Sequence, residues 1–156
     1  MENRSRRMGL KTLLVVAIVS FLSTVGVTAA YAVSSAVLAI GPYGGIKYSN
    51  QAQLSPTSGS LTAYTVVQIT SNTTGNPVPA NQYAGQARIY KSQNGALCVA
   101  TGMVYNTYDL SGYAVRVDGI CDPGIYHYSK GRTLHYSSSL PGYLSFDTYN
   151  TPGVIP

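Results

Sequence analysis

The densest run of chemically active side chains is YHYSKGRTLHY, residues 126–136. It combines phenol hydroxyls with two cations and with the imidazoles of His127 and His135. Imidazole titrates near neutral pH and is the commonest metal ligand in proteins, whereas tyrosine offers a large contact area with a hydrogen-bonding tip. The run therefore predicts a binding surface. Its candidate contact residues are Tyr126, Tyr128, Lys130, Arg132 and His135.

Gly131 predicts the tight turn of a β-hairpin within this run. A three-residue loop centred on Gly131 would set His127 opposite His135, whereas a Lys130-Gly131 loop would set His127 opposite Leu134. Two facing imidazoles make half of a metal site, but zinc needs three or four ligands and the sequence offers no convincing further one. We therefore expect no metal, no cofactor, and two solvated histidines on an exposed face.

Carboxylates are too few to favour acid–base catalysis. Glu2 is the only glutamate, and the rest of the chain contains Asp109, Asp118, Asp122 and Asp147. The G-x-S-x-G and H-E-x-x-H motifs are missing from the sequence, as is a phosphate-binding glycine loop. We expect a protein that is not an enzyme. A small hydrolase that uses His127 or His135 is the alternative that these residues leave open.

Cys98 and Cys121 are the only cysteines, and in an exported chain such a pair favours a structural disulfide. Residues 96–105 and 112–121 have the composition of two strands. A hairpin that turns at Asp109-Leu110 would set Cys98 opposite Cys121, and directly opposed Cβ atoms are close to the distance that a disulfide spans. We therefore expect a bridge between two neighbouring strands.

The first 32 residues have the pattern of an export signal. The basic head contains Arg4, Arg6, Arg7 and Lys11. An uncharged apolar run follows at 12–30, and Ala30-Tyr31-Ala32 matches the small-x-small pattern that signal peptidases cleave. We expect cleavage after Ala32. The alternative is an uncleaved membrane anchor, since about 20 apolar residues span a bilayer. In both cases the remaining chain is secreted or extracellular, and only the N-terminal segment contacts the membrane.

The remaining chain carries six Lys or Arg and four Asp, a net charge of +2. This small excess does not predict a nucleic-acid partner. The expected partner is a cell-wall polymer, a glycan or an extracellular protein, and the sequence leaves the oligomeric state open.

Turn residues divide the rest of the chain. Residues 33–60 contain GPYGG and SPTSGS, which predict a linker with one irregular strand near 46–48. Residues 61–156 contain short β-rich runs separated by glycine turns, without a convincing helical period. We predict an all-β fold, a small antiparallel β-sandwich or barrel, after an N-terminal signal or anchor helix at 1–32.

Four short runs carry a resemblance to a known group of proteins. They are ARIYKSQNGALC, GIYHYSKGRTLHY, GYLSFDTY and TPGVIP, which fall within roughly the last 70 residues. In these runs the chain resembles small exported, Tyr-rich β proteins of Gram-positive bacteria. The resemblance implies a bacterial origin and a β fold, but no activity and no site residues.

These observations predict a secreted, non-enzymatic binding protein that acts at or outside the cell envelope through the Tyr/cationic hairpin. The alternative is a secreted antagonist, either a bacteriocin-like toxin or a hydrolase inhibitor.

Overall fold

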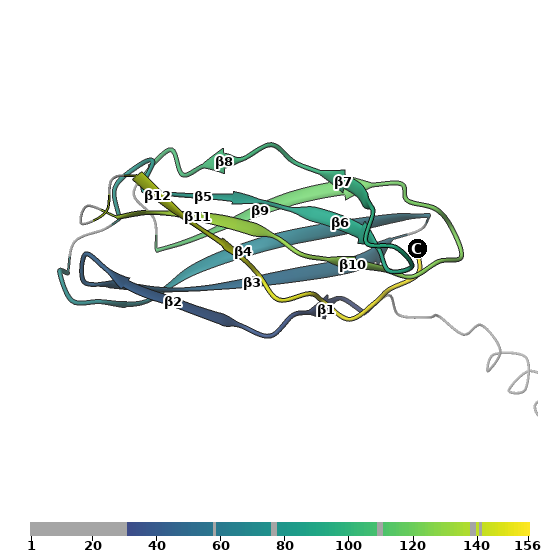
Figure 1. The fold of residues 1–156 in the computed structure, drawn as a ribbon, viewed down its shortest axis with the longest axis horizontal. Coiled ribbons are helices and arrows are strands. Elements are labelled where there is room, and N and C mark those ends of the chain that lie inside the picture. Colours follow the sequence, from purple (N-terminus) through teal and green to yellow (C-terminus); the bar gives the residue numbers. More distant parts are fainter. Residues whose placement is uncertain (1–30, 58, 76–77, 109–110, 138–139, 141) are drawn as a thin grey trace, which may run out of the picture.

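The computed structural model describes residues 31–57, 59–75, 78–108, 111–137, 140 and 142–156. These residues form antiparallel β-sheets and include no helix, which confirms the all-β prediction (Figure 1). It follows that none of the described segments is a helix long and apolar enough to cross a bilayer. The predicted signal or anchor helix falls almost entirely outside the described residues.

The described residues form twelve strands. They are β1 (Val33–Ser34), β2 (Leu38–Tyr43), β3 (Ile46–Thr57), β4 (Ser60–Asn72), β5 (Tyr83–Gln86), β6 (Arg88–Lys91), β7 (Leu97–Ala100), β8 (Val104–Tyr105), β9 (Gly112–Gly119), β10 (His127–Ser129), β11 (Arg132–Ser137) and β12 (Gly142–Asp147).

One layer of the fold is a five-stranded sheet in the order β1-β3-β4-β9, with β2 also paired to β3. The long strands β3 and β4 are consecutive and pair along almost their whole length. Their inward side chains alternate with outward ones, which is the pattern of a sheet with one buried face.

The other layer consists of two smaller sheets, β10-β6-β7 and β12-β11-β5-β8. Only Ala87 separates β5 from β6, and only Lys130 and Gly131 separate β10 from β11. Figure 1 shows each of these strand pairs end to end. The two small sheets are therefore two halves of one layer that is interrupted midway, and the sheets do not close into a barrel.

Residues 33–57 belong to the large sheet, so the linker predicted for 33–60 is wrong. The GPYGG run does contain a turn: Gly44 and Gly45 both have positive φ and join β2 to β3 as a two-residue hairpin. In β3 the inward positions include the polar Asn50 and the small Ala52. Neither is a strong strand former, so the period of two was hard to see in the sequence.

The predicted disulfide is confirmed, with Cys98 and Cys121 bonded to each other, but the hairpin from which it was derived is wrong. β7, which contains Cys98, pairs with β6, and β9, which precedes Cys121, pairs with β4. The bridge therefore joins the two layers instead of two neighbouring strands. A Cβ on Gly119 would lie 2.5 Å from a methyl carbon of Val99, so glycine allows the layers to approach closely here.

The layers enclose two apolar clusters. One contains Leu54, Leu61, Ala63, Ala87, Ile89, Val115, Val117 and Cys121, and the other contains Ile40, Tyr48, Val67, Val78 and Tyr83. Buried polar groups also connect the layers: the amide of Asn50 in β3 donates to Thr133 Oγ1 in β11 over 2.9 Å. This bond gives the buried amide nitrogen of Asn50 a partner.

Candidate functional site: an outward Tyr and cation face

Residues 126–137 run along the second layer without folding back on themselves. β10 pairs with β6, while β11 pairs with β5 and β12, and within the described chain β10 and β11 do not pair with each other. Both hairpin registers predicted around Gly131 are therefore wrong. His127 lies opposite Lys91 and His135 lies opposite Tyr83.

Gly131 lies where the two layers approach each other closely, and it is not the turn of a hairpin. A Cβ at this position would lie 1.9 Å from Thr65 Oγ1, on β4 of the facing layer. The backbone N–H of Gly131 donates to Thr148 Oγ1 over 2.9 Å. Glycine is thus required because the two layers meet here with no space for a side chain.

Side chains alternate strictly along this stretch. The odd-numbered positions are all buried: His127, Ser129, Gly131, Thr133, His135 and Ser137. The even-numbered positions are all at least partly exposed: Tyr126, Tyr128, Lys130, Arg132, Leu134 and Tyr136. The prediction of two solvated histidines is therefore wrong, because both are completely buried. Of the five candidate contact residues, four point outward and His135 points into the interior.

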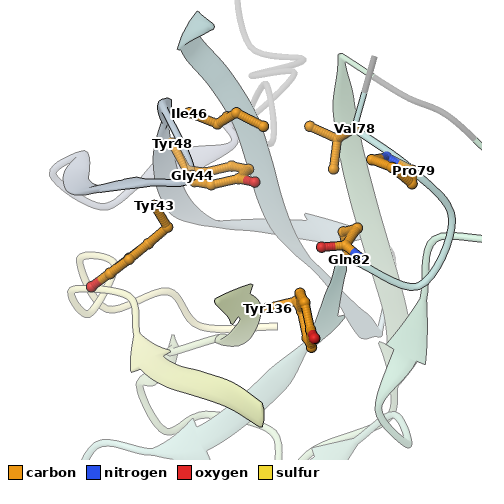
Figure 2. A pocket seen from close by; sticks show the side chains of 8 residues that line it. All are labelled: Tyr43, Gly44, Ile46, Tyr48, Val78, Pro79, Gln82 and Tyr136. Carbon is orange, nitrogen blue, oxygen red and sulfur yellow. The ribbon is translucent and has the colours of Figure 1, made fainter. Parts of the chain in front are cut away.

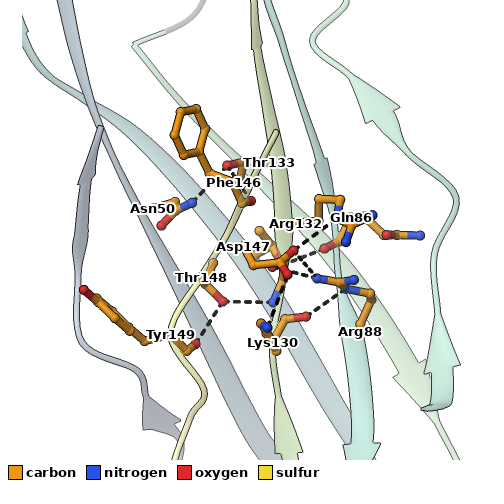
Figure 3. A network of polar contacts seen from close by, with 12 residues as sticks. Asn50, Gln86, Arg88, Lys130, Arg132, Thr133, Phe146, Asp147, Thr148 and Tyr149 are labelled. Atoms are coloured by element: carbon orange, nitrogen blue, oxygen red, sulfur yellow. Dashed lines mark hydrogen bonds and ion pairs between the residues drawn. The ribbon is translucent and has the colours of Figure 1, made fainter. Parts of the chain in front are cut away.

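A cluster of three cations surrounds Asp147 on the outward side (Figure 3). Asp147 Oδ1 lies 2.7 Å from Arg88 Nη2 and 3.0 Å from Arg132 Nε, and Oδ2 lies 3.2 Å from Lys130 Nζ. Arg88 also donates to the main-chain carbonyls of Lys130 and Gly131. The sequence prediction missed Arg88 and Asp147, because they come from other strands.

The charges of this cluster do not cancel. Partial burial raises the pKa of Asp147, but the hydrogen bonds from Arg132, Arg88 and Lys130 outweigh this effect and lower the pKa to about 2. One carboxylate therefore faces three cations, which leaves a net charge of +2. The side chain of Arg88 is only 10% exposed, whereas those of Lys130 and Arg132 are 37% and 43% exposed. Lys130 and Arg132 remain accessible to an anion.

Tyrosines flank the cation cluster on both sides. Towards β6 and β10, Tyr90 and Tyr128 lie opposite each other and stack, with 5.3 Å between ring centroids, and the Arg88 guanidinium lies 5.7 Å from the Tyr90 centroid. Towards β8 and β12, Tyr143 contacts both Tyr105 and Tyr136 edge to face, with centroids 5.6 and 5.7 Å apart.

We call this surface the Tyr–cation face. It comprises Arg88, Tyr90, Tyr105, Tyr128, Lys130, Arg132, Tyr136, Tyr143 and Asp147. Tyr128 and Tyr136 are eight residues apart along nearly continuous strand, so the face extends about 26 Å. The sequence did contain an indication of this face, because Tyr128, Lys130, Arg132 and Tyr136 all stand at even-numbered positions, and alternate residues of a strand point to the same side.

A small pocket adjoins the face at Tyr136 (Figure 2). Its volume is about 160 Å³, and its lining consists of Tyr43, Gly44, Ile46, Tyr48, Val78, Pro79, Gln82 and Tyr136. None of these eight residues carries a formal charge, and burial raises the pKa of Tyr48, so its phenol stays neutral. The pocket can hold a single uncharged ring or side chain, since ligand pockets for larger molecules are at least about 300 Å³.

The chemistry that this arrangement offers is recognition. Two accessible cations can pair with phosphate or carboxylate groups, and the flanking phenols can contact rings while their hydroxyls exchange hydrogen bonds. No protein-family model matches this chain, and no curated protein or solved structure matches it significantly. Any functional inference therefore rests on the geometry of the Tyr–cation face.

Proposed function

We propose that this protein is a non-enzymatic binding domain that acts at or outside the cell envelope and contacts an anionic wall polymer or glycan through the Tyr–cation face. The observation that carries the proposal is the net charge of +2 at Arg88, Lys130, Arg132 and Asp147, held between two groups of at least partly exposed tyrosines on one layer of the fold.

The geometry suits a long ligand better than a compact one. A polymer with repeated anionic groups can pair with Lys130 and Arg132 while its rings or apolar parts lie on the tyrosines at either end. Asp147 favours this arrangement because it holds the cations in fixed positions, so that less side-chain entropy is lost on binding. The pocket at Tyr136 would accept one neutral ring at the end of the face.

An extracellular location is part of the same proposal. The disulfide supports it, since such bonds persist in oxidising compartments. Cleavage after Ala32 would leave Val33, the first residue of β1, at the new N-terminus. The intact mass of the protein recovered from culture medium tests this: we expect a chain that begins at Val33, and recovery of the whole chain in the cytosol alone would contradict it.

Retention on purified cell wall tests the charge of the face. We expect the Lys130→Gln/Arg132→Gln variant to bind about tenfold or more weakly, because two charge-assisted contacts are lost. Added salt should weaken binding of the unaltered protein in the same direction. The matched control is Arg116→Gln, since Arg116 is an exposed arginine that is likewise paired with an aspartate, Asp118, but lies on the opposite surface.

The tyrosines need a separate comparison. Tyr143→Ala should weaken wall retention, whereas Tyr64→Ala should not, because Tyr64 lies beside Arg116 on the opposite surface. Near-ultraviolet circular dichroism of each variant checks that the fold is intact. Wall retention that is equal for folded variants of both surfaces would rule out the Tyr–cation face as the binding site.

A further inference from the structure

Three potential metal-ligating atoms meet where the two layers are bridged. The Sγ atoms of Cys98 and Cys121 and a ring nitrogen of His127 all lie within 4.8 Å of one another. They come from β7, from the segment after β9 and from the start of β10. Cys121 and His127 are buried, while Cys98 is partly exposed.

His127 provides an independent indication of a ligand. Its side chain is completely buried, and its Nδ1 lies 3.0 Å from the main-chain carbonyl of Ile125. An N–H at Nδ1 would donate to that carbonyl and leave the Nε2 lone pair available. Nε2 is buried and has no hydrogen-bond partner among the described residues. A backbone carbonyl that orients the imidazole through Nδ1 is the usual support of a metal-binding histidine.

We propose that in the reduced protein Cys98, Cys121 and His127 bind a thiophilic divalent cation such as Zn²⁺. The disulfide and the metal would then be alternative ways to close the same junction between the layers. This inference does not depend on the Tyr–cation face, and it places the sulfur atoms in a role beyond the structural bridge.

The redox step requires a dithiol as the reductant. The dithiol transfers two electrons and two protons to the bridge, its own sulfur atoms become a disulfide, and the S–S bond between Cys98 and Cys121 is replaced by two thiols. Both thiols lose their protons when they bind the cation. Two thiolates and a neutral imidazole around Zn²⁺ carry no net charge, so the site is compatible with burial.

The ligand set leaves one coordination position for solvent. Zinc is commonly held by three protein ligands with water in the fourth position, and Cys₂His is one of the known sets. Among the described residues, Asp122 is the nearest carboxylate along the chain to Cys121, but it is paired with Lys91. Solvent can enter beside the partly exposed Cys98.

Co²⁺ titration of the reduced full chain tests the proposal, because thiolate–cobalt bonds give characteristic absorption. We expect one Co²⁺ per reduced chain, displacement by Zn²⁺, and no such absorption from the oxidised protein. His127→Asn should weaken Co²⁺ binding about tenfold or more, since asparagine can still donate to the Ile125 carbonyl but lacks Nε2. The matched control is His135→Asn, which alters the other completely buried histidine, eight residues away on β11.

Two results would overturn the inference. One is a reduced chain, folded by circular dichroism, that shows no thiolate–cobalt absorption. The other is equal Co²⁺ affinity for His127→Asn and the unaltered protein, which would mean that the thiols alone bind the cation. If the reduced chain unfolds without metal, its recovery of ordered structure on addition of Zn²⁺ becomes the readout, and failure to recover counts against the site.

Discussion

His135 shows how much a single residue depends on its surroundings. Its ring lies between Tyr48, with centroids 4.5 Å apart, and Phe146, with centroids 5.6 Å apart. Nε2 lies 3.2 Å from Thr133 Oγ1, which already accepts from Asn50 and donates towards the Phe146 carbonyl. Nε2 therefore carries the proton, and a second proton would have to occupy the buried Nδ1, which has no partner among the described residues.

We predict that His135 makes stability depend on pH. Burial lowers the pKa of His135 from 6.5 to about 4, so the folded state binds its proton less readily than the unfolded state. Stability should be greatest above pH 6.5, decrease as the pH falls towards 4, and level off below that, with a loss of up to about 3 kcal/mol. Urea unfolding measured across this pH range gives the slope of the unfolding free energy against pH.

The variant His135→Phe keeps an aromatic ring at this position and should remove most of that slope. Asp147 does not interfere, since its lowered pKa of about 2 means that its contribution is present above its ordinary pKa of 3.8 and is lost only as the pH falls towards 2. An unchanged slope between pH 6.5 and 4 in the variant would show that another group is responsible.

The elements of the second layer are all interrupted at the same level, between β5 and β6, between β10 and β11, and between β7 and β8. Side chains satisfy the main-chain groups that leave the ladders there: Thr101 Oγ1 accepts from the N–H of Ala87, and Arg88 donates to the carbonyls of Lys130 and Gly131, the two residues between β10 and β11. These hydrogen bonds therefore fix the position of the Arg88 guanidinium as well as that of the backbone.

We predict that Gly131→Ala destabilises the protein by about 2 kcal/mol or more, because its Cβ would overlap Thr65 and push the layers apart. The control is Gly102→Ala, which also lies in an interruption but has no atom within 4 Å of the added Cβ, and should change stability by less than about 0.5 kcal/mol. Equal unfolding free energies for the two variants would contradict the close approach.

At the scale of the whole molecule, the disulfide and the buried polar contacts hold the layers together in addition to the apolar clusters, and Cys121 itself belongs to one of these clusters. Cys98 and Cys121 are 23 residues apart in the sequence, and the connection between them passes through β8 and β9 on opposite layers. A bridge that closes a loop of this length restricts the unfolded chain considerably.

We predict that Cys98→Ser/Cys121→Ser lowers the free energy of unfolding by about 3 kcal/mol, in line with the loop-closure entropy. Urea unfolding in the presence of a chelator measures this loss without any contribution from a bound metal. Reduction of the unaltered protein should produce a similar decrease. A loss below about 1 kcal/mol in both experiments would indicate that the layers hold together without the bridge.

Local patterns were sufficient for several features of this protein. Short β-rich runs between glycines identify the all-β class, because turn residues and side-chain period act within a few positions. The two cysteines could pair only with each other. Tyr128, Lys130 and Arg132 occupy alternate positions, and alternate side chains of a strand leave the same face; this places them on one face because the chain does not turn back at Gly131.

Tertiary structure alone decided which strands pair and which face is buried. Gly131 has the sequence context of a turn, yet it lies between two strands that do not fold back on each other. Glycine is needed there because Thr65, 66 residues earlier, faces it from the other layer. Three polar residues, His127, Thr133 and His135, are completely buried. Residues of the distant strand β3 contact Thr133 and His135, and the disulfide lies beside His127. Long-range contacts of this kind determine register, burial and the position of Asp147 among its three cations, and a strand's own residues do not encode them.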